Sequence, residues 1–397
     1  MDFFTKIDIP ATDWQIDYNS HIAFFGSCFA DNISAQFASR KFNVLTNPFG
    51  TVYNPLSIAM QIKAIANKKV FGGPEIFQDM RPDRAGNSAP WHCWDAHGSL
   101  SAATREDCVA KLNEASIHAL DFLQKTDATF ITLGTSFVYF LKDIGAAVSN
   151  CHQQNPNLFI RKMISVDHVA AALKSIVQDL QKIKNDMRIV FTVSPLRHMS
   201  DGAHGNTLSK ATLQLAIEKV IQEITPPGSH APFGVRAARN DIGAECDRNV
   251  LISVAETNQS CTLCNDVGAE RGGNVHISIA EANQSCAPRN DVGIPTPTIS
   301  YFPSYEIVMD ELRDYRFYDS DMVHLSKTAE EYIFERMTEV YCNGKIRDNI
   351  KQVEKFLKMA NHRIQDEHSP ATVEFRQRML EEATKLEKQI PGLTLNM

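Results

Sequence analysis

Residues 21–30, HIAFFGSCFA, decide the fold class. His21–Phe25 is a short apolar run, which is typical of a buried strand, and Phe29–Arg40 has helical periodicity. Gly26 permits the tight turn that joins them. A buried strand that turns directly into a helix opens a βαβ unit, and such units predict a parallel sheet.

The same alternation recurs further along the chain. Apolar runs lie at Thr129–Leu133 and Ile189–Ser194, and helical periodicity is found at Val166–Ile183 and Leu208–Ile224. Strands that alternate with helices predict an α/β fold with a mostly parallel sheet.

Composition divides the chain into four parts. We expect the α/β domain to comprise residues 1–224 and 299–342, followed by a charged helical tail at 343–397. In residues 225–298 the motif N-D-I/V-G occurs three times at a spacing of 25 residues. Only two of these units are complete, which is fewer than a solenoid needs. The segment is therefore predicted to be a repetitive, low-order insertion between a helix and the next strand.

The insertion also contains candidate zinc ligands. Cys261 and Cys264 form a C-x₂-C pair, with Cys246, His276 and Cys286 nearby. A zinc ribbon needs a second close pair, which this segment lacks. We therefore favour incidental cysteines in a surface loop and expect no metal.

The overall charge and hydropathy exclude several classes of partner. The chain of 397 residues has 40 basic and 47 acidic side chains and a net charge of -7, so nucleic acid is not expected as a partner. No apolar run is long enough to cross a bilayer, so a membrane is not expected either. The N-terminus lacks an apolar signal region, and nine scattered cysteines fit reduced thiols. These features together predict a cytoplasmic protein.

The first strand-to-helix turn, Gly26-Ser27-Cys28, is a candidate catalytic site. A nucleophile at such a turn is exposed at the carboxyl edge of the sheet. The free N–H groups and dipole of the helix N-terminus can lower a thiol pKa or hold an oxyanion. Either Ser27 or Cys28 is a candidate nucleophile. The alternative is a turn of small residues in which Cys28 is simply buried.

Late in the chain, Asp321 and His324 form a D-x-x-H pair. On one turn, an aspartate can orient and charge-stabilise an imidazole that acts as a general base. By itself this spacing is common on protein surfaces, so the pair is weak evidence.

The turn after the strand Thr129–Leu133 is a second candidate element of the site. We expect Gly134-Thr135-Ser136 to be another strand-to-helix turn, whose N–H groups or hydroxyls face the same crevice. The simpler alternative is that Thr135 or Ser136 caps a helix.

Two further loops carry polar side chains that suit substrate binding. Arg197 and His198 follow the strand Ile189–Ser194, while Asp95 and His97 lie in the stretch WHCWDAH. For the second loop we favour a packed aromatic segment with satisfied polar groups.

Several blocks of this sequence resemble one known family. Gly26–Ala30 is the motif that names the GSCFA family of bacterial proteins, and TLGTSFVY, SNCHQQ, TVSPLRH, YFPSYEIVMDELRDYRFY and DMVHLS resemble its other blocks in order. The resemblance covers residues 1–224 and 299–342. That family is similar to the SGNH (GDSL-like) hydrolases, which implies a flavodoxin-like three-layer αβα fold. It also implies an acyl-ester hydrolase or acyltransferase, with its nucleophile in the first block.

The sequence departs from the superfamily pattern in two places. The first block of the superfamily reads Gly-Asp-Ser, so here the nucleophile register falls on Cys28 and Ser27 takes the place of the aspartate. The third block normally supplies an Asn to the oxyanion hole, and Gly134-Thr135-Ser136 has none. A thiol nucleophile would suit acyl transfer through a thioester.

We therefore predict Cys28 as the nucleophile, with Ser27 as the second candidate, His324 as the base and Asp321 as its orienting partner. The predicted oxyanion donors are N–H groups near Cys28 together with Gly134 and Ser136.

The expected substrate is a small-molecule or glycan acyl ester. No metal or redox cofactor is expected, and an acyl carrier such as coenzyme A is implied only if the protein is a transferase. The oligomeric state is left open. The alternative is a non-catalytic ligand-binding module on a hydrolase fold.

Overall fold

The computed structural model describes residues 5–81, 89–224, 298–361 and 369–395. The repetitive segment predicted at 225–298, with its cysteines, lies outside these residues except for Thr298.

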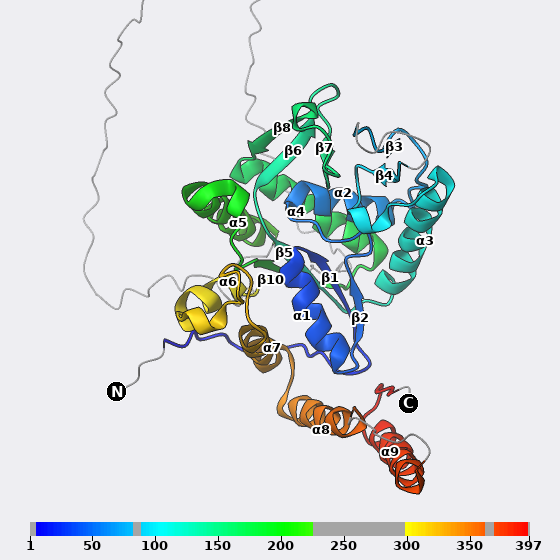
Figure 1. Cartoon of the computed structure of the whole chain (residues 1–397). Helices are drawn as coiled ribbons and strands as arrows, with labels where there is room; N and C mark the ends of the chain where they lie inside the picture. Colours follow the sequence, from blue (N-terminus) through cyan, green and yellow to red (C-terminus); the bar gives the residue numbers. More distant parts are fainter. Residues whose placement is uncertain (1–4, 82–88, 225–297, 362–368, 396–397) are drawn as a thin grey trace, which may run out of the picture. The chain divides into compact units, whose positions relative to one another are not determined.

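The centre of the fold is a five-stranded parallel sheet (Figure 1). Its strands, in spatial order, are β10 (Ile299–Tyr301), β9 (Arg188–Val193), β5 (Ala128–Leu133), β1 (His21–Gly26) and β2 (Asn43–Thr46). Renumbered along the chain, this order is 2-1-3-4-5, which is that of flavodoxin-like folds. The predicted parallel α/β sheet and the flavodoxin-like class are confirmed.

Helices cover both faces of the sheet because successive side chains of a strand point to opposite sides. In β1, Ala23 and Phe25 belong to one apolar core, and Ile22 and Phe24 to the other. The first core is completed by α2 (Pro55–Ala66), α3 (Arg105–Leu123), α4 (Val166–Ile183) and α5 (Gly202–Ile224). The second core is completed by α1 (Cys28–Ser39), α7 (Lys327–Tyr341), α8 (Gly344–Ala360) and α9 (Pro370–Gln389).

The helical tail shares the second core with the domain before it. Val353 and Phe356 of α8 and Leu386 of α9 are buried in the same cluster as Phe24. None of the helices in the described ranges combines the length and the apolarity that a membrane span requires.

Small antiparallel sheets extend the fold beside α2 and α4 (Figure 1). One contains β3 (Ile76–Gln78) and β4 (Trp91–Cys93), and the other β6 (Phe137–Leu141), β7 (Ala147–Val148) and β8 (Phe159–Met163). The expectation that Gly134–Ser136 leads into a helix is therefore wrong. Four of the next five residues, FVYFL, are aromatic or β-branched, and the five pair antiparallel with β8.

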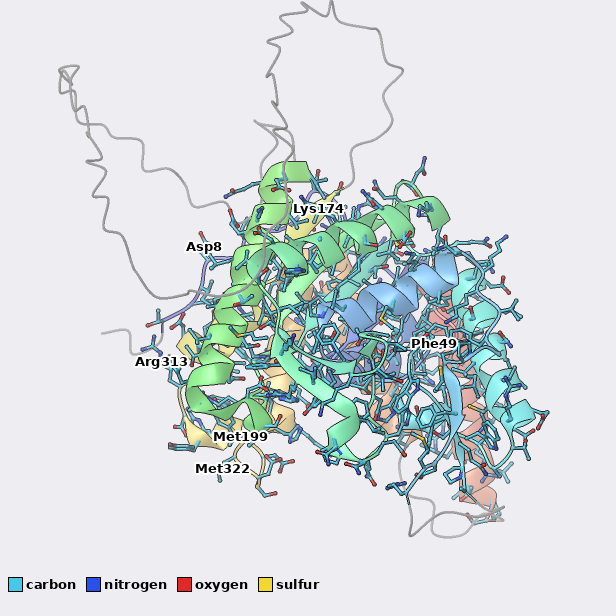
Figure 2. The ribbon with its side chains drawn as sticks, turned by 90° about the horizontal axis from the view of Figure 1, so that it is seen from above. Asp8, Phe49, Lys174, Met199, Arg313 and Met322 are labelled. Carbon is cyan, nitrogen blue, oxygen red and sulfur yellow. The ribbon has the colours of Figure 1, made fainter. Side chains whose placement is uncertain are left out.

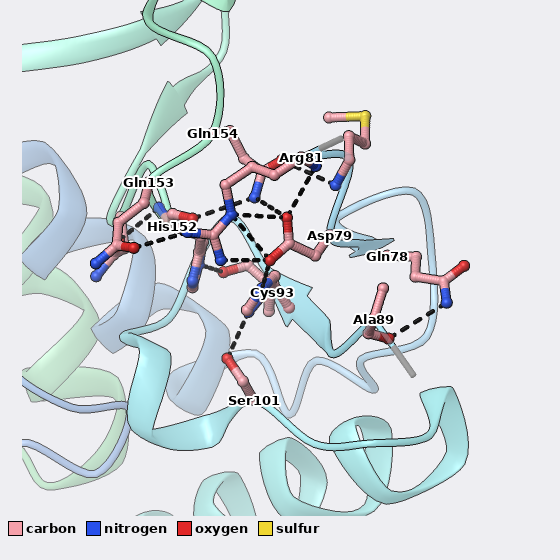
Figure 3. A network of polar contacts seen from close by, with 12 residues as sticks. Gln78, Asp79, Arg81, Ala89, Cys93, Ser101, His152, Gln153 and Gln154 are labelled. Atoms are coloured by element: carbon pink, nitrogen blue, oxygen red, sulfur yellow. Dashed lines mark hydrogen bonds and ion pairs between the residues drawn. The ribbon is translucent and has the colours of Figure 1, made fainter. Parts of the chain in front are cut away.

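A buried polar network holds the loop around β3 and β4 in place (Figure 3). The carboxylate of Asp79 accepts hydrogen bonds from Arg81 Nε, at 3.0 Å, and from Gln154 Nε2, at 2.9 Å. These two partners hold the pKa of Asp79 well below its usual range. The rings of His92 and His152 stack 4.5 Å apart beside the network. The WHC stretch and the SNCHQQ block therefore pack against each other.

Candidate functional site

A cavity of about 310 Å³ opens at the carboxyl edge of the sheet. Its lining includes six of the residues predicted from the sequence: Ser27, Cys28, Gly134, Arg197, His198 and His324. Ligands of open α/β sheets bind in the crevice at this edge, where the strand order reverses. The three turns that follow β1, β5 and β9 thus meet at one place.

The first turn depends on a glycine. Gly26 has φ of 128°, and a Cβ there would lie 2.0 Å from the carbonyl oxygen of Thr132 on the neighbouring strand. The N–H of Gly26 donates to Asn47 Oδ1 at 2.8 Å, which ties β1 to the loop after β2. The chain therefore reverses tightly enough to start α1 directly above the sheet.

Ser27 is the N-cap residue of α1 and Cys28 is the first residue of the helix. Ser27 is 1% exposed, and its buried hydroxyl has no hydrogen-bond partner among the described residues. Cys28 is more accessible, and the backbone N–H groups of Cys28 and Phe29 favour the thiolate form of its side chain. These N–H groups belong to the first helical turn, which leaves them without partners inside the helix.

The expected lowering of the Cys28 thiol pKa is not found. Burial of the thiol raises its pKa, and the nearby carboxylate of Asp31 raises it further. The two backbone N–H groups and Lys210 act in the opposite direction but are outweighed. The helix terminus favours the thiolate as expected, but desolvation is the larger effect in this cavity.

His324 and Asp321 form a pair at the other wall of the site. Nδ1 of His324 lies 2.5 Å from Oδ2 of Asp321, and the Asp321 carboxylate also accepts the N–H groups of His324 and Val323. These bonds lower the pKa of Asp321 to about 2. Because the carboxylate only accepts, Nδ1 carries the proton and Nε2 is left to take one. Both side chains are about half exposed.

The turn after β5 does not supply free oxyanion donors, contrary to expectation. The N–H groups of Gly134 and Thr135 both donate to the carbonyl oxygen of Tyr53, at 2.8 and 3.0 Å. The N–H of Ser136 donates to the hydroxyl of Ser209 at 2.7 Å. The candidate donors that are left from the predicted set are therefore the N–H groups in the first turn of α1, those of Cys28 and Phe29.

A second histidine–aspartate pair borders the same cavity. Nδ1 of His198 lies 2.9 Å from Oδ1 of Asp201, whose other oxygen accepts the Thr135 hydroxyl at 2.7 Å. The Asp201 side chain is fully buried and also pairs with Arg161. Burial lowers the pKa of His198, with the charges of Arg161 and Lys210 adding to the effect. Sequence reasoning missed Asp201, although it stands three residues after His198.

Lys210 was also missed. It is 2% exposed, and its Nζ donates to the carbonyl oxygens of Gly134 and Ser194. The sequence does contain a signal for it. Lys210 stands three residues before Leu213 and seven before Ile217, so helical periodicity puts it on the apolar face of its helix.

Asp95 and His97 do not line this cavity. Asp95 Oδ2 accepts the Lys69 ammonium at 2.8 Å, and His97 donates its backbone N–H to the carbonyl of Phe49. Both residues belong to the packed segment beside β4, where the rings of Phe77 and Trp94 stack 3.6 Å apart.

A groove of about 570 Å³ continues from the cavity and shares Arg197, Met199 and Val323 with it. Met199 and Met322, which come from different loops, both line it and lie near each other in Figure 2. Methionine side chains adapt to apolar groups of varied shape. Within the described ranges, His, Cys, Asp and Glu form no group of three that could hold a metal ion.

The fold and the cavity define a class of protein: a three-layer αβα domain with a cysteine and a histidine–aspartate pair at the carboxyl edge of its sheet. The chain belongs to the GSCFA family, whose family model matches residues 21–227 and 290–337. This confirms the resemblance drawn from the sequence blocks.

Other comparisons are more distant. No curated protein matches the chain. Among solved structures, it is similar to an acetyl xylan esterase from the rumen bacterium Butyrivibrio proteoclasticus, with 14% identity and a TM-score of 0.22. The match covers 53% of this chain and 54% of the esterase, so the chain spans about half of that protein's length. A similarity at this level does not assign a function to this chain.

Proposed function

We propose that the protein transfers acyl groups from esters to water or to another acceptor, with Cys28 as the nucleophile. The observation that carries the proposal is the shared cavity: Cys28, at the N-terminus of α1, and His324, which is paired with Asp321, line the same 310 Å³. A nucleophile, a base and an orienting carboxylate are the parts that this chemistry needs.

In the first step, His324 Nε2 takes the proton of the Cys28 thiol as the sulfur attacks the ester carbonyl. The N–H groups of Cys28 and Phe29 stabilise the negative charge that develops on the carbonyl oxygen. The bond from the carbonyl carbon to the alcohol oxygen then breaks, and the alcohol leaves with the proton from His324.

The second step releases the acyl group from the resulting thioester. Water or an acceptor hydroxyl gives its proton to His324 and attacks the thioester carbonyl. The carbon–sulfur bond breaks, and the proton returns to the Cys28 sulfur. The apolar groove that shares Arg197 and Met199 with the cavity supplies room for one part of the ester.

The test is to trap the acyl-enzyme. The full chain is incubated with a p-nitrophenyl ester, quenched in acid, and mapped by peptide mass spectrometry. We expect the acyl mass on the peptide that contains Cys28 and its removal by neutral hydroxylamine, which cleaves thioesters readily. An adduct on Ser27 that resists neutral hydroxylamine would assign the reaction to the serine instead.

A second candidate function is ligand binding without catalysis. It is favoured by the raised pKa of the Cys28 thiol and by the occupied N–H groups of Gly134 and Ser136. In that case Cys28 and Ser27 both stay unmodified by esters and by electrophilic probes in a folded sample. The acyl-enzyme experiment therefore separates the two functions.

A further inference from the structure

The strand-to-helix turn that carries Cys28 is held by an asparagine from a different loop. Asn47, which follows β2, is 7% exposed, and its Oδ1 accepts the backbone N–H of Gly26 at 2.8 Å. Its Nδ2 donates to Oδ1 of Asp31, in the first turn of α1, at 2.6 Å. The carboxamide therefore bridges the residue at which the turn begins and a residue that lies three positions beyond Cys28.

The two side chains complement each other as donor and acceptor. A side-chain amide both donates and accepts, whereas a carboxylate only accepts. The N–H of Gly26 requires an oxygen and the carboxylate of Asp31 requires a donor, so a single orientation of the Asn47 amide satisfies both. The other oxygen of Asp31 accepts the hydroxyl of Thr51 at 2.7 Å. Three hydrogen bonds from side chains thus join the turn, the helix and the loop after β2.

The backbone of this loop is tied to β1 as well. The N–H of Asn47 donates to the carbonyl oxygen of Phe24 at 2.9 Å, and the N–H of Val52 donates to that of Gly26 at 3.0 Å. Asn47 has φ of 38°, in the left-handed region that asparagine adopts more readily than most residues. Both backbone polar groups of Gly26 are therefore bound by the loop after β2.

We propose that Asn47 and Asp31 are positioning residues for Cys28: their hydrogen bonds hold the turn on both sides of the nucleophile and so fix where its thiol lies in the cavity. The inference rests on the proposed function in taking Cys28 as the nucleophile. Neither residue belongs to the cavity lining, so both act through the turn and not on the substrate. A reacting atom that is misplaced by about 1 Å can cost about 10²-fold in rate.

The test exchanges the two side chains between their positions. Asn47→Asp alone sets two carboxylates against each other where the bond is now 2.6 Å, so the turn should loosen. Asp31→Asn alone leaves two amides, which can still bond to each other, and should be tolerated. In the double variant, Asn47→Asp with Asp31→Asn, the new carboxylate accepts the Gly26 N–H and the new amide, whose oxygen accepts the Thr51 hydroxyl. All three side-chain bonds can then form again.

The first readout is the rate of acyl-enzyme formation from a p-nitrophenyl ester, measured in single turnovers against ester concentration. We expect Asn47→Asp to lower the limiting rate by about tenfold or more and to leave the half-saturating concentration nearly unchanged, because the ester binds as before but meets a misplaced sulfur. The double variant should recover most of the rate. Asn47→Ala removes both bonds without adding a charge and should be as slow as Asn47→Asp.

The second readout needs no substrate. Hydrogen exchange of the peptide with residues 21–30, followed by mass spectrometry of the full chain, should be faster in Asn47→Asp and Asn47→Ala and native in the double variant. The matched control is Asn67→Asp, at the exposed end of α2, which should change neither readout. If Asn47→Asp does not fold, Thr51→Val removes one bond to Asp31 and should shift both readouts in the same direction to a smaller extent.

Two results would overturn the proposal. One is a native acylation rate in Asn47→Asp and Asn47→Ala. The other is a double variant that stays as slow as Asn47→Asp. An absent acyl-enzyme in the native protein would instead reject the proposed function, and hydrogen exchange would still decide whether Asn47 and Asp31 hold the turn.

Discussion

Nδ1 of His324 lies 2.5 Å from Oδ2 of Asp321, and the same carboxylate caps the turn by accepting the His324 backbone N–H. The two contacts fix both the tautomer and the direction of the imidazole. Met322, between them, adopts φ of 58°, a conformation that non-glycine residues rarely adopt. The conformation of this turn therefore holds Asp321 and His324 in contact. The role of the pair in the proposed reaction can be measured.

Replacing His324 by Gln should lower kcat by about 10²-fold or more while leaving Tm nearly unchanged, because the half-exposed ring contributes to proton transfer and not to the core. Steady-state ester turnover and a thermal melt provide the two readouts. His168→Gln, at an exposed histidine on α4, is the control and should keep full activity.

The competing base is His198, which borders the same cavity and pairs with Asp201. If His198→Gln abolished turnover and His324→Gln did not, the general base would be His198 and the proposed role of His324 would be wrong. Because Asp201 is buried in contact with Thr135 and Arg161, the His198 variant should also be less stable than the His324 variant.

The nucleophile can be separated from its neighbour by two alanine variants. Cys28→Ala should abolish acyl-enzyme formation, whereas Ser27→Ala should keep most of it. The reason is that the Cys28 side chain is partly exposed in the cavity, whereas the Ser27 hydroxyl is buried. If Cys28→Ala kept its activity and a serine-directed phosphonate labelled Ser27 in that variant, the nucleophile would be Ser27 and not Cys28.

The pH dependence of Cys28 alkylation follows from its raised pKa. A thiol whose folded-state pKa lies above its ordinary value is mostly protonated at neutral pH and forms thiolate only as the pH rises past that value. Iodoacetamide should therefore react slowly with Cys28 at pH 7 and progressively faster as the pH becomes alkaline. Cys151, also partly exposed and with a pKa raised to about 11, is the internal reference. Fast reaction at neutral pH would show that the cavity opens in solution.

The polar network around Asp79 should be important for stability and not for chemistry. Asp79→Asn leaves the Arg81 guanidinium without its carboxylate, so we expect a loss of about 3 kcal/mol in the free energy of unfolding. Urea unfolding measures this loss. Asp143→Asn, at an exposed aspartate, should change stability by less than about 0.5 kcal/mol. Equal effects of the two substitutions would contradict a structural role.

The predicted insertion, residues 225–298, can be tested by replacement. The helix α5 ends at Ile224 and β10 starts at Ile299, so a short Gly/Ser linker joins two elements that the fold already contains. We expect a cooperative melt to survive, since loop closure costs only about 0.6 kcal/mol per doubling of length. Loss of the cooperative melt would show that the segment is part of the domain.

The sequence by itself determined the local elements. The HIAFF run and its GSC turn predicted β1 and the start of α1, and the period of Val166–Ile183 matches α4 residue for residue. The Asp321–His324 pair was also predictable, because its partners are three residues apart on one turn. In each case spacing along the chain is enough, since strand and helix periods act over a few residues.

Only the tertiary structure decided which N–H groups of the site are free to donate and in which direction the pKa of the Cys28 thiol is shifted. The N–H groups of Gly134 and Thr135 are occupied by the carbonyl of Tyr53, a residue far upstream, so no local pattern could exclude them as donors. The direction of the Cys28 pKa likewise depends on how deeply packing buries the sulfur and on Lys210 from a distant helix. Hydrogen-bond partners and desolvation depend on residues that are distant in the sequence and become neighbours only in the folded protein. Local sequence patterns therefore cannot predict them.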